Sequence, residues 1–188
     1  MNKLQKYFLT CLCFVSIAAP YPMSYAQSRP GALSFTFGGG YEYFASKRRM
    51  ENTGLGFFAL GYDFTEHWGL EGFLAGFRTN FQRNVGDNSR IGGTLFAVDG
   101  IYHFNPDCLL PPSYTLQPYL LAGFGVTGLN PNRTDANNEG NINAGLGLAL
   151  SLHHAVALRL EARDFYTIVG GKNDVIVDGG ISFIFDLC

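Results

Sequence analysis

The histidines, serines and glycines of this chain of 188 residues are the residues that could support catalysis or ligand binding. A serine nucleophile needs a base such as histidine within hydrogen-bond reach. No histidine in the chain precedes a serine by two residues; the histidines are His67, His103, His153 and His154. The pair at 153–154 has no further metal ligand near it in the sequence, whereas a zinc site needs three or four protein ligands. The sequence therefore favours neither a catalytic nor a metal site.

Residues 123–128 read Gly-Phe-Gly-Val-Thr-Gly, which matches the dinucleotide-binding pattern letter by letter. In that pattern the glycine turn opens a helix, and the helix N-terminus holds the pyrophosphate. Here the run Asn130-Pro131-Asn132 follows, and it does not begin a helix. We therefore expect no nucleotide and no other cofactor.

Arg159, Glu161 and Arg163 alternate with apolar residues. This spacing places all three on one face of a strand, and opposite charges on a buried face must pair. We predict an interior charge network of Glu42, Glu71, Asp99, Arg159, Glu161 and Arg163. Replacing Arg159 should strongly lower the stability of the barrel, and replacing Arg163, which lies nearer the outer rim, should lower it less. Two alternatives stay open: a gate or path for protons or ions, and paired carboxylates for catalysis.

The segments that hold these charges alternate with period two, as strands with two different faces do. In the third segment Phe73 and Phe77 fall on the face of Glu71, which predicts a bulge there. We predict an all-β fold, an eight-stranded antiparallel transmembrane β-barrel. Its strands are expected at about 33–44, 53–64, 68–77, 91–104, 118–129, 141–152, 155–166 and 174–187.

The charged face also decides which side of the barrel meets lipid. A binder of apolar ligands needs an apolar lumen, whereas stacked charges require the apolar face to point outward, as in outer-membrane barrels. The interior of such a barrel is just wide enough for side chains to fill it. Aromatic girdles at the two membrane interfaces are expected from Tyr41, Tyr43, Trp68, Tyr102, Phe104 and Phe185.

The N-terminus has the pattern of a secretory signal peptide. Lys3 and Lys6 precede a mostly apolar run over residues 7–19, and a small-residue motif ends at Ala26. We predict a signal peptide over residues 1–26 and a mature barrel over residues 27–188. Cys108 and Cys188 would then enter an oxidising compartment.

The connections alternate in length, which predicts the orientation. Short turns at 65–67 and 153–154 share one end with both termini, and longer polar connections lie at the other end. This plan predicts the outer membrane of a Gram-negative bacterium, with both termini periplasmic. The connection 105–117 is long although it is periplasmic, so we predict that it reaches across the barrel mouth and joins Cys108 to Cys188. Two free thiols, or a link from Cys188 to another chain, are the alternatives.

Basic residues cluster in or beside the predicted outer loops. We interpret them first as ordinary solvated loop charge; the functional alternative is contact with anionic partners, either lipopolysaccharide phosphates or a host surface. These residues are Lys47, Arg48, Arg49, Arg83, Arg90 and Arg133. The net charge of −2 and the pI near 6.0 argue against a nucleic-acid partner.

Several motifs in order are similar to one family. They are Gly61-Tyr62-Asp63-Phe64, Trp68-Gly69-Leu70-Glu71, Pro118-Tyr119-Leu120-Leu121-Ala122-Gly123, Leu158-Arg159-Leu160-Glu161, and an aromatic-alternating terminal strand. The chain after residue 32 resembles the OmpA/OmpX-type, opacity-like outer-membrane β-barrel domains. The resemblance implies a terminal strand that the barrel-assembly machinery reads, although Leu187-Cys188 here follows Phe185.

For function, we expect a non-enzymatic barrel that contributes to envelope integrity or to surface interaction and adhesion. Its expected partners are outer-membrane lipid and lipopolysaccharide. A narrow channel for small or hydrophobic solutes is the first alternative. A lipid A-modifying barrel enzyme is the second.

Overall fold

A computed structural model describes residues 29–81, 90–104, 116–131 and 137–186. The predicted signal peptide, Arg83, Cys108, Arg133 and Cys188 lie outside these ranges, so the predictions made for them stay predictions. Within the described residues, no helix is long and apolar enough to cross a membrane.

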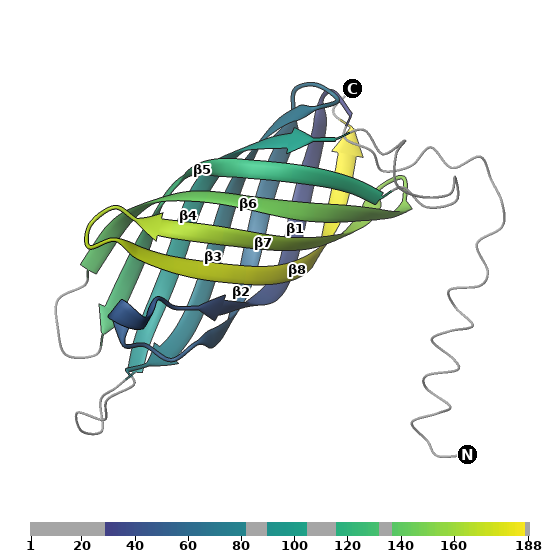
Figure 1. Cartoon of the computed structure of the whole chain (residues 1–188). Coiled ribbons are helices and arrows are strands. Elements are labelled where there is room, and N and C mark those ends of the chain that lie inside the picture. Colours follow the sequence, from purple (N-terminus) through teal and green to yellow (C-terminus); the bar gives the residue numbers. More distant parts are fainter. Residues whose placement is uncertain (1–28, 82–89, 105–115, 132–136, 187–188) are drawn as a thin grey trace, which may run out of the picture.

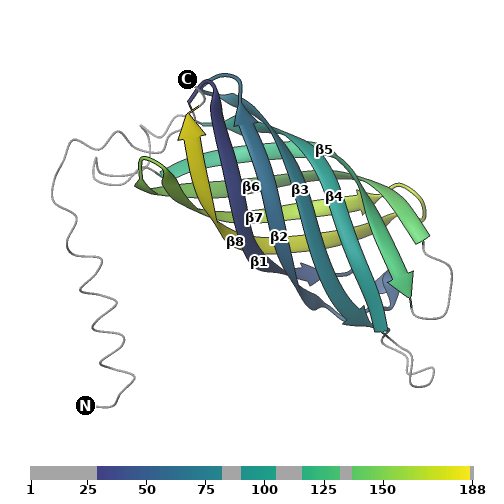
Figure 2. The ribbon, with the colours of Figure 1, turned by 180° about the vertical axis from the view of Figure 1, so that it is seen from behind.

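Eight antiparallel strands form a closed barrel in which each strand pairs with its neighbours in sequence and β8 pairs with β1 (Figures 1 and 2). This confirms the predicted fold. The strands are β1 Ala32–Tyr43, β2 Thr53–Asp63, β3 Trp68–Asn80, β4 Arg90–His103, β5 Leu116–Pro131, β6 Asn137–His153, β7 Val156–Thr167 and β8 Lys172–Asp186. A short 3-10 helix, η1 (Ser46–Arg48), lies between β1 and β2.

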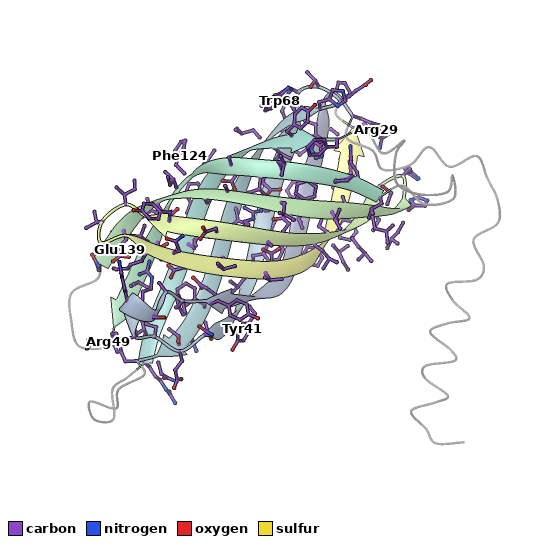
Figure 3. All side chains as sticks on the ribbon, viewed as in Figure 1. Arg29, Tyr41, Arg49, Trp68, Phe124 and Glu139 are labelled. Atoms are coloured by element: carbon purple, nitrogen blue, oxygen red, sulfur yellow. The ribbon has the colours of Figure 1, made fainter. Side chains whose placement is uncertain are left out.

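The two ends of the barrel differ. We call the end with the turns after β2 and β6 the turn end; there Arg29 pairs with Asp186 at 2.9 Å. We call the opposite end, with η1 and the β7–β8 connection, the loop end. Figure 3 shows Arg29 and Trp68 toward the turn end and Arg49 and Glu139 toward the loop end.

The alternating pattern produces an apolar outer wall. Along β6, Ile142 and Leu146 are 51% and 60% exposed, whereas Asn141 and Asn143, on the opposite face, are buried. Large apolar side chains cover the outside of the other strands in the same way, including Phe124 on β5 (Figure 3). The interior positions are small, polar or tightly packed.

The third strand contains no bulge, so this prediction was wrong. β3 pairs with β4 residue for residue from Trp68 to Asn80. Phe73 and Phe77 share the inward face with Glu71 because the barrel has an apolar layer inside, where both rings are buried. The irregular register lies instead between Ser151 and His153, in the pairing of β6 with β7.

Three kinds of layer follow one another along the interior. From the turn end toward the loop end, β7 presents Arg163, then Phe165, then Thr167, and β8 presents Asp178, then Ile176, then Asp174. We call the middle level the apolar layer. Its buried residues are Met50, Leu55, Phe57, Ala59, Phe73, Ala75, Phe77, Ile91, Leu95, Ala97, Phe165 and Ile176.

The packing of the apolar layer requires a glycine at position 93. A Cβ atom there would lie 2.0 Å from the ring of Phe77, whereas one at the neighbouring Gly92, which faces outward, would meet nothing within 4 Å. We expect Gly93→Ala to lower the free energy of unfolding by about 1–3 kcal/mol through overpacking, and Gly92→Ala to leave it nearly unchanged. Urea unfolding in lipid vesicles measures both variants. Equal stability of the two would contradict this account of the layer.

Candidate functional site

Arg163 is the centre of a buried charge network at the turn-end side of the apolar layer. Its guanidinium donates to Asp99 Oδ2, Glu71 Oε1 and Glu161 Oε2, each at 2.7 Å. The side chain has no exposed surface. Its charge also lies over the ring of Phe73, 4.1 Å from the ring centroid. Carboxylates from β3, β4 and β7 therefore converge on one cation.

Arg159 extends this network toward the turn end. Its Nη1 donates to Glu71 Oε2 at 2.5 Å and to Thr36 Oγ1 at 3.2 Å, and its Nη2 donates to Glu161. Its Nε donates to Tyr119 Oη at 3.1 Å, and that hydroxyl also donates to Glu161. Glu71 and Glu161 are thus each shared between the two arginines.

Hydroxyl and amide groups complete the network. Asn143 Nδ2 donates to Asp99 Oδ1 at 2.8 Å, and the hydroxyls of Thr36 and Ser182 share a hydrogen bond. Polar groups that are buried this deeply are costly unless they are paired. The arrangement closes the cross-section of the barrel at this level with ion pairs.

The structure brings together Glu71, Asp99, Arg159, Glu161 and Arg163 in this network, which we call the inner network. Glu42, expected with them, is buried on the inward face but lies beyond the network, level with Ile176 in the pairing of β1 and β8. Its Oε2 has no hydrogen-bond partner. The inward face of Glu42 was therefore right and its depth in the barrel was wrong.

Asp178 belongs to the same region and was not anticipated. It lies opposite Glu161 in the pairing of β7 and β8, and it is 3% exposed. Both of its carboxylate oxygens are buried without a hydrogen bond. Its position, four residues before the inward-facing Ser182, would have placed it on the inward face.

A second charge network, the outer network, closes the barrel at the loop end. Arg48 donates through Nε to Asp174 Oδ2 at 2.7 Å, through Nη1 to Glu139 Oε2 at 2.7 Å, and through Nη2 to Thr167 Oγ1 at 2.8 Å. Lys172 Nζ donates to Glu139 Oε1 at 2.6 Å. The backbone N–H of Ala45 donates to Asp174, so η1 is tied to the strands below it.

The outer network corrects the expectation that Arg48 contacts an external anion. Its side chain is 3% exposed because η1 turns it into the barrel, where two carboxylates neutralise it. Lys47 donates to the carbonyl of Gly171 at 3.0 Å and remains exposed. Arg49, the one non-glycine residue with a positive φ in the described chain (52°), and Arg90 are also exposed.

The four histidines lie at the turn end of the barrel. The rings of His153 and His154 lie with centroids 3.8 Å apart and are tilted by 49°, and His103 Nε2 lies 3.3 Å from Asp63 Oδ1. Among the residues with described positions, no group of at least three His, Cys, Asp and Glu side chains could hold a metal ion.

From the structure we expect the loss of Arg163 to destabilise the barrel more than the loss of Arg159, which is the opposite of the order expected from the sequence. Arg163 is fully buried with Glu71, Asp99 and Glu161, whereas the side chain of Arg159 is 10% exposed. We expect Arg163→Ala to lower the free energy of unfolding by about 3–5 kcal/mol, and Arg159→Ala by less. Leu160→Ala, which changes a lipid-facing residue between them, is the matched control. Urea unfolding in lipid vesicles measures all three, and equal values for Arg163→Ala and Leu160→Ala would refute the role of the inner network.

Comparisons with known proteins agree with this architecture. The barrel domain of OprF from Pseudomonas aeruginosa is 19% identical, with a TM-score of 0.60, and the match covers 83% of this chain and 98% of that one. OprG from the same organism is 11% identical, with a TM-score of 0.62, over 87% and 100%. Neisserial surface protein A is 14% identical, with a TM-score of 0.62, over 82% and 99%.

No curated protein sequence matches the chain. Residues 9–183, however, match the sequence family described as "Outer membrane protein beta-barrel domain". This match, together with the closed eight-stranded barrel and its apolar outer wall, shows that the chain belongs to the outer-membrane β-barrel family and is an outer-membrane protein.

Proposed function

We propose that this protein is a sealed, non-enzymatic barrel that contributes to envelope integrity and presents its loop end at the cell surface. The observation that carries the proposal is the filled interior. The inner network, the apolar layer and the outer network follow one another along the axis of the barrel. Water or ions would have to cross all three levels.

The apolar layer is the strongest barrier to conduction. Its buried rings include Phe57 and Phe73, which stack with centroids 5.3 Å apart. An ion that entered this region would lose its hydrating water, and no polar group would replace that water. On the turn-end side, the space beside Arg159 and Tyr119 has a volume of about 50 Å³, well below the about 300–1,000 Å³ of a typical ligand pocket. A solute channel has no room here.

The proposed orientation places the loop end outside the cell and both termini in the periplasm. Short turns and the ends of β1 and β8 share the turn end, as in outer-membrane barrels. The exposed Arg49 at the loop end then faces the medium, where basic side chains suit anionic surfaces. We also propose that the barrel-assembly machinery reads β8, on which Phe185 is 52% exposed.

The sealed interior predicts that the native protein gives no single-channel steps in planar bilayers. Removing the stacked rings with Phe57→Ala and Phe73→Ala should introduce leak current, because the apolar layer then contains a void. The control is Phe58→Ala with Leu74→Ala, which removes outward side chains from the neighbouring positions. Discrete steps from the native protein that all variants share would favour the channel alternative. A change in lipid A acylation on overexpression would favour the enzyme alternative.

The orientation predicts which residues a membrane-impermeant maleimide reaches in intact cells. Arg49→Cys at the loop end should be labelled, whereas Glu66→Cys in the turn after β2 should be labelled only after lysis. The parent chain, with its own cysteines, gives the background. The reverse pattern would show that the loop end faces the periplasm.

A further inference from the structure

The outer wall of the barrel is hollowed near the loop end of β2 to β6. A hollow of about 640 Å³ is lined by Gly54, Gly76, Phe77, Arg78, Gly92, Gly93, Thr94, Gly128, Leu129, Asn130 and Asn138. A second hollow of about 570 Å³ adjoins it at Arg78, Gly92 and Asn130 and extends to Arg90. This surface lies outside the barrel and belongs to neither charge network.

Cross-strand pairing arranges this wall in rows. One row passes from Gly56 to Gly76, Thr94, Gly128 and Asn138 on successive strands. The next row toward the membrane centre consists of exposed apolar side chains, Phe58, Leu74, Phe96 and Val126. The next row toward the loop end contains Arg78, Gly92 and Asn130. An apolar row and a basic rim thus border a floor that is mostly backbone.

The hollow interrupts the aromatic girdle. Over β7 and β1 the loop end of the wall carries Tyr166, Tyr41 and Tyr43, which are 41% to 48% exposed. Tyr41 is paired with Gly54, where the hollow begins. Ring side chains usually occupy this level of an outer-membrane barrel, and here a polar, open surface replaces them.

Two arginines on this surface lack an acidic partner. Arg78 lies opposite Gly92, and Arg90 lies opposite Asn80, so the two are diagonal neighbours on the outer wall. Both are exposed, and neither has an ion pair within the described chain, whereas Arg48, Arg159 and Arg163 each pair with carboxylates. The nearby Glu51 carboxylate accepts a hydrogen bond from Asn80 at 3.2 Å.

We infer that this hollow binds the phosphorylated headgroup of lipopolysaccharide in the outer leaflet. Arg78 and Arg90 hold a phosphate, for which the planar guanidinium fork is suited. Thr94, Asn130 and Asn138 face the sugar over the glycine floor, and the acyl chains follow the apolar row below. A two-fold dimer through this same face would instead bury both arginines against a like charge. The inference rests on the proposed orientation of the loop end.

Binding to the purified, folded full-length protein in detergent tests the inference. The probe is diphosphorylated lipid A, and its affinity is measured by titration with a fluorescent analogue. The paired change Arg78→Gln and Arg90→Gln should weaken binding at least about tenfold, because it removes charge-assisted hydrogen bonds. Gly76→Leu with Gly92→Leu should weaken it similarly by filling the hollow without altering charge. Arg29→Gln, which removes a basic residue at the opposite, turn end of the barrel, should leave the affinity unchanged.

Three comparison ligands test which part of lipid A is recognised. Dephosphorylated lipid A, phosphatidylglycerol micelles and inorganic phosphate should each bind at least about tenfold more weakly than diphosphorylated lipid A. Equal binding of any one of them would overturn the assignment, as would full affinity of the Arg78→Gln, Arg90→Gln variant or dimerisation through this face. The gel shift between unheated and boiled samples verifies that each variant is folded. Because the assay needs neither cells nor conductance, its failure leaves the sealed-barrel proposal untouched, and maleimide labelling tests the orientation separately.

Discussion

The hydrogen-bonded closure of β8 on β1 is the constraint on which the rest of the structure depends. In hydrocarbon every backbone N–H and C=O of the wall needs a partner, and a closed ring of strands provides one throughout. In a closed barrel each side chain of a strand points either outward to lipid or inward to the interior. It also fixes the interior at a width that side chains must fill. A polar group on the inward face is therefore buried, and it is stable there only when it forms hydrogen bonds or ion pairs with other interior groups.

The inner and outer networks are the consequence of that burial. A buried guanidinium is tolerated only among carboxylates, which explains why Arg163 contacts three of them and why Arg48 turns inward to Asp174 and Glu139. The apolar layer between the networks needs no partners and contributes dense packing. Both carboxylate oxygens of Asp178 and Oε2 of Glu42, like the amide oxygens of Asn141 and Asn143, are buried in the described interior without a hydrogen-bond partner, and this pairing rule does not explain them.

Period two in the sequence was sufficient to predict the faces, because side-chain direction alternates strictly along a strand. It therefore placed Arg159, Glu161 and Arg163 together inside the barrel. Depth is set by strand tilt and register, which the alternation does not encode, and so Glu42 was assigned to the wrong level. Arg48 was missed as an interior residue because η1 has no such period. Glu139 was missed because the strand predicted from residue 141 begins at Asn137 in the structure. Asp174 was predicted as the first residue of a strand, but its partner Arg48 was not foreseen.

The same reasoning about depth applies to the outer wall. An arginine on the lipid face costs about 2–4 kcal/mol at the membrane midplane and about 0–1 kcal/mol near the interface. Arg78 lies four residues beyond the lipid-exposed Leu74 on β3, or roughly 13 Å along the strand. Because the strands of such barrels tilt by about 35–45°, this separation is roughly 10 Å of depth, which in the proposed arrangement puts Leu74 in hydrocarbon and Arg78 among headgroups. Gly76, between them, then lies where the two environments meet, so the order of side chains on one strand follows the order of layers in the membrane.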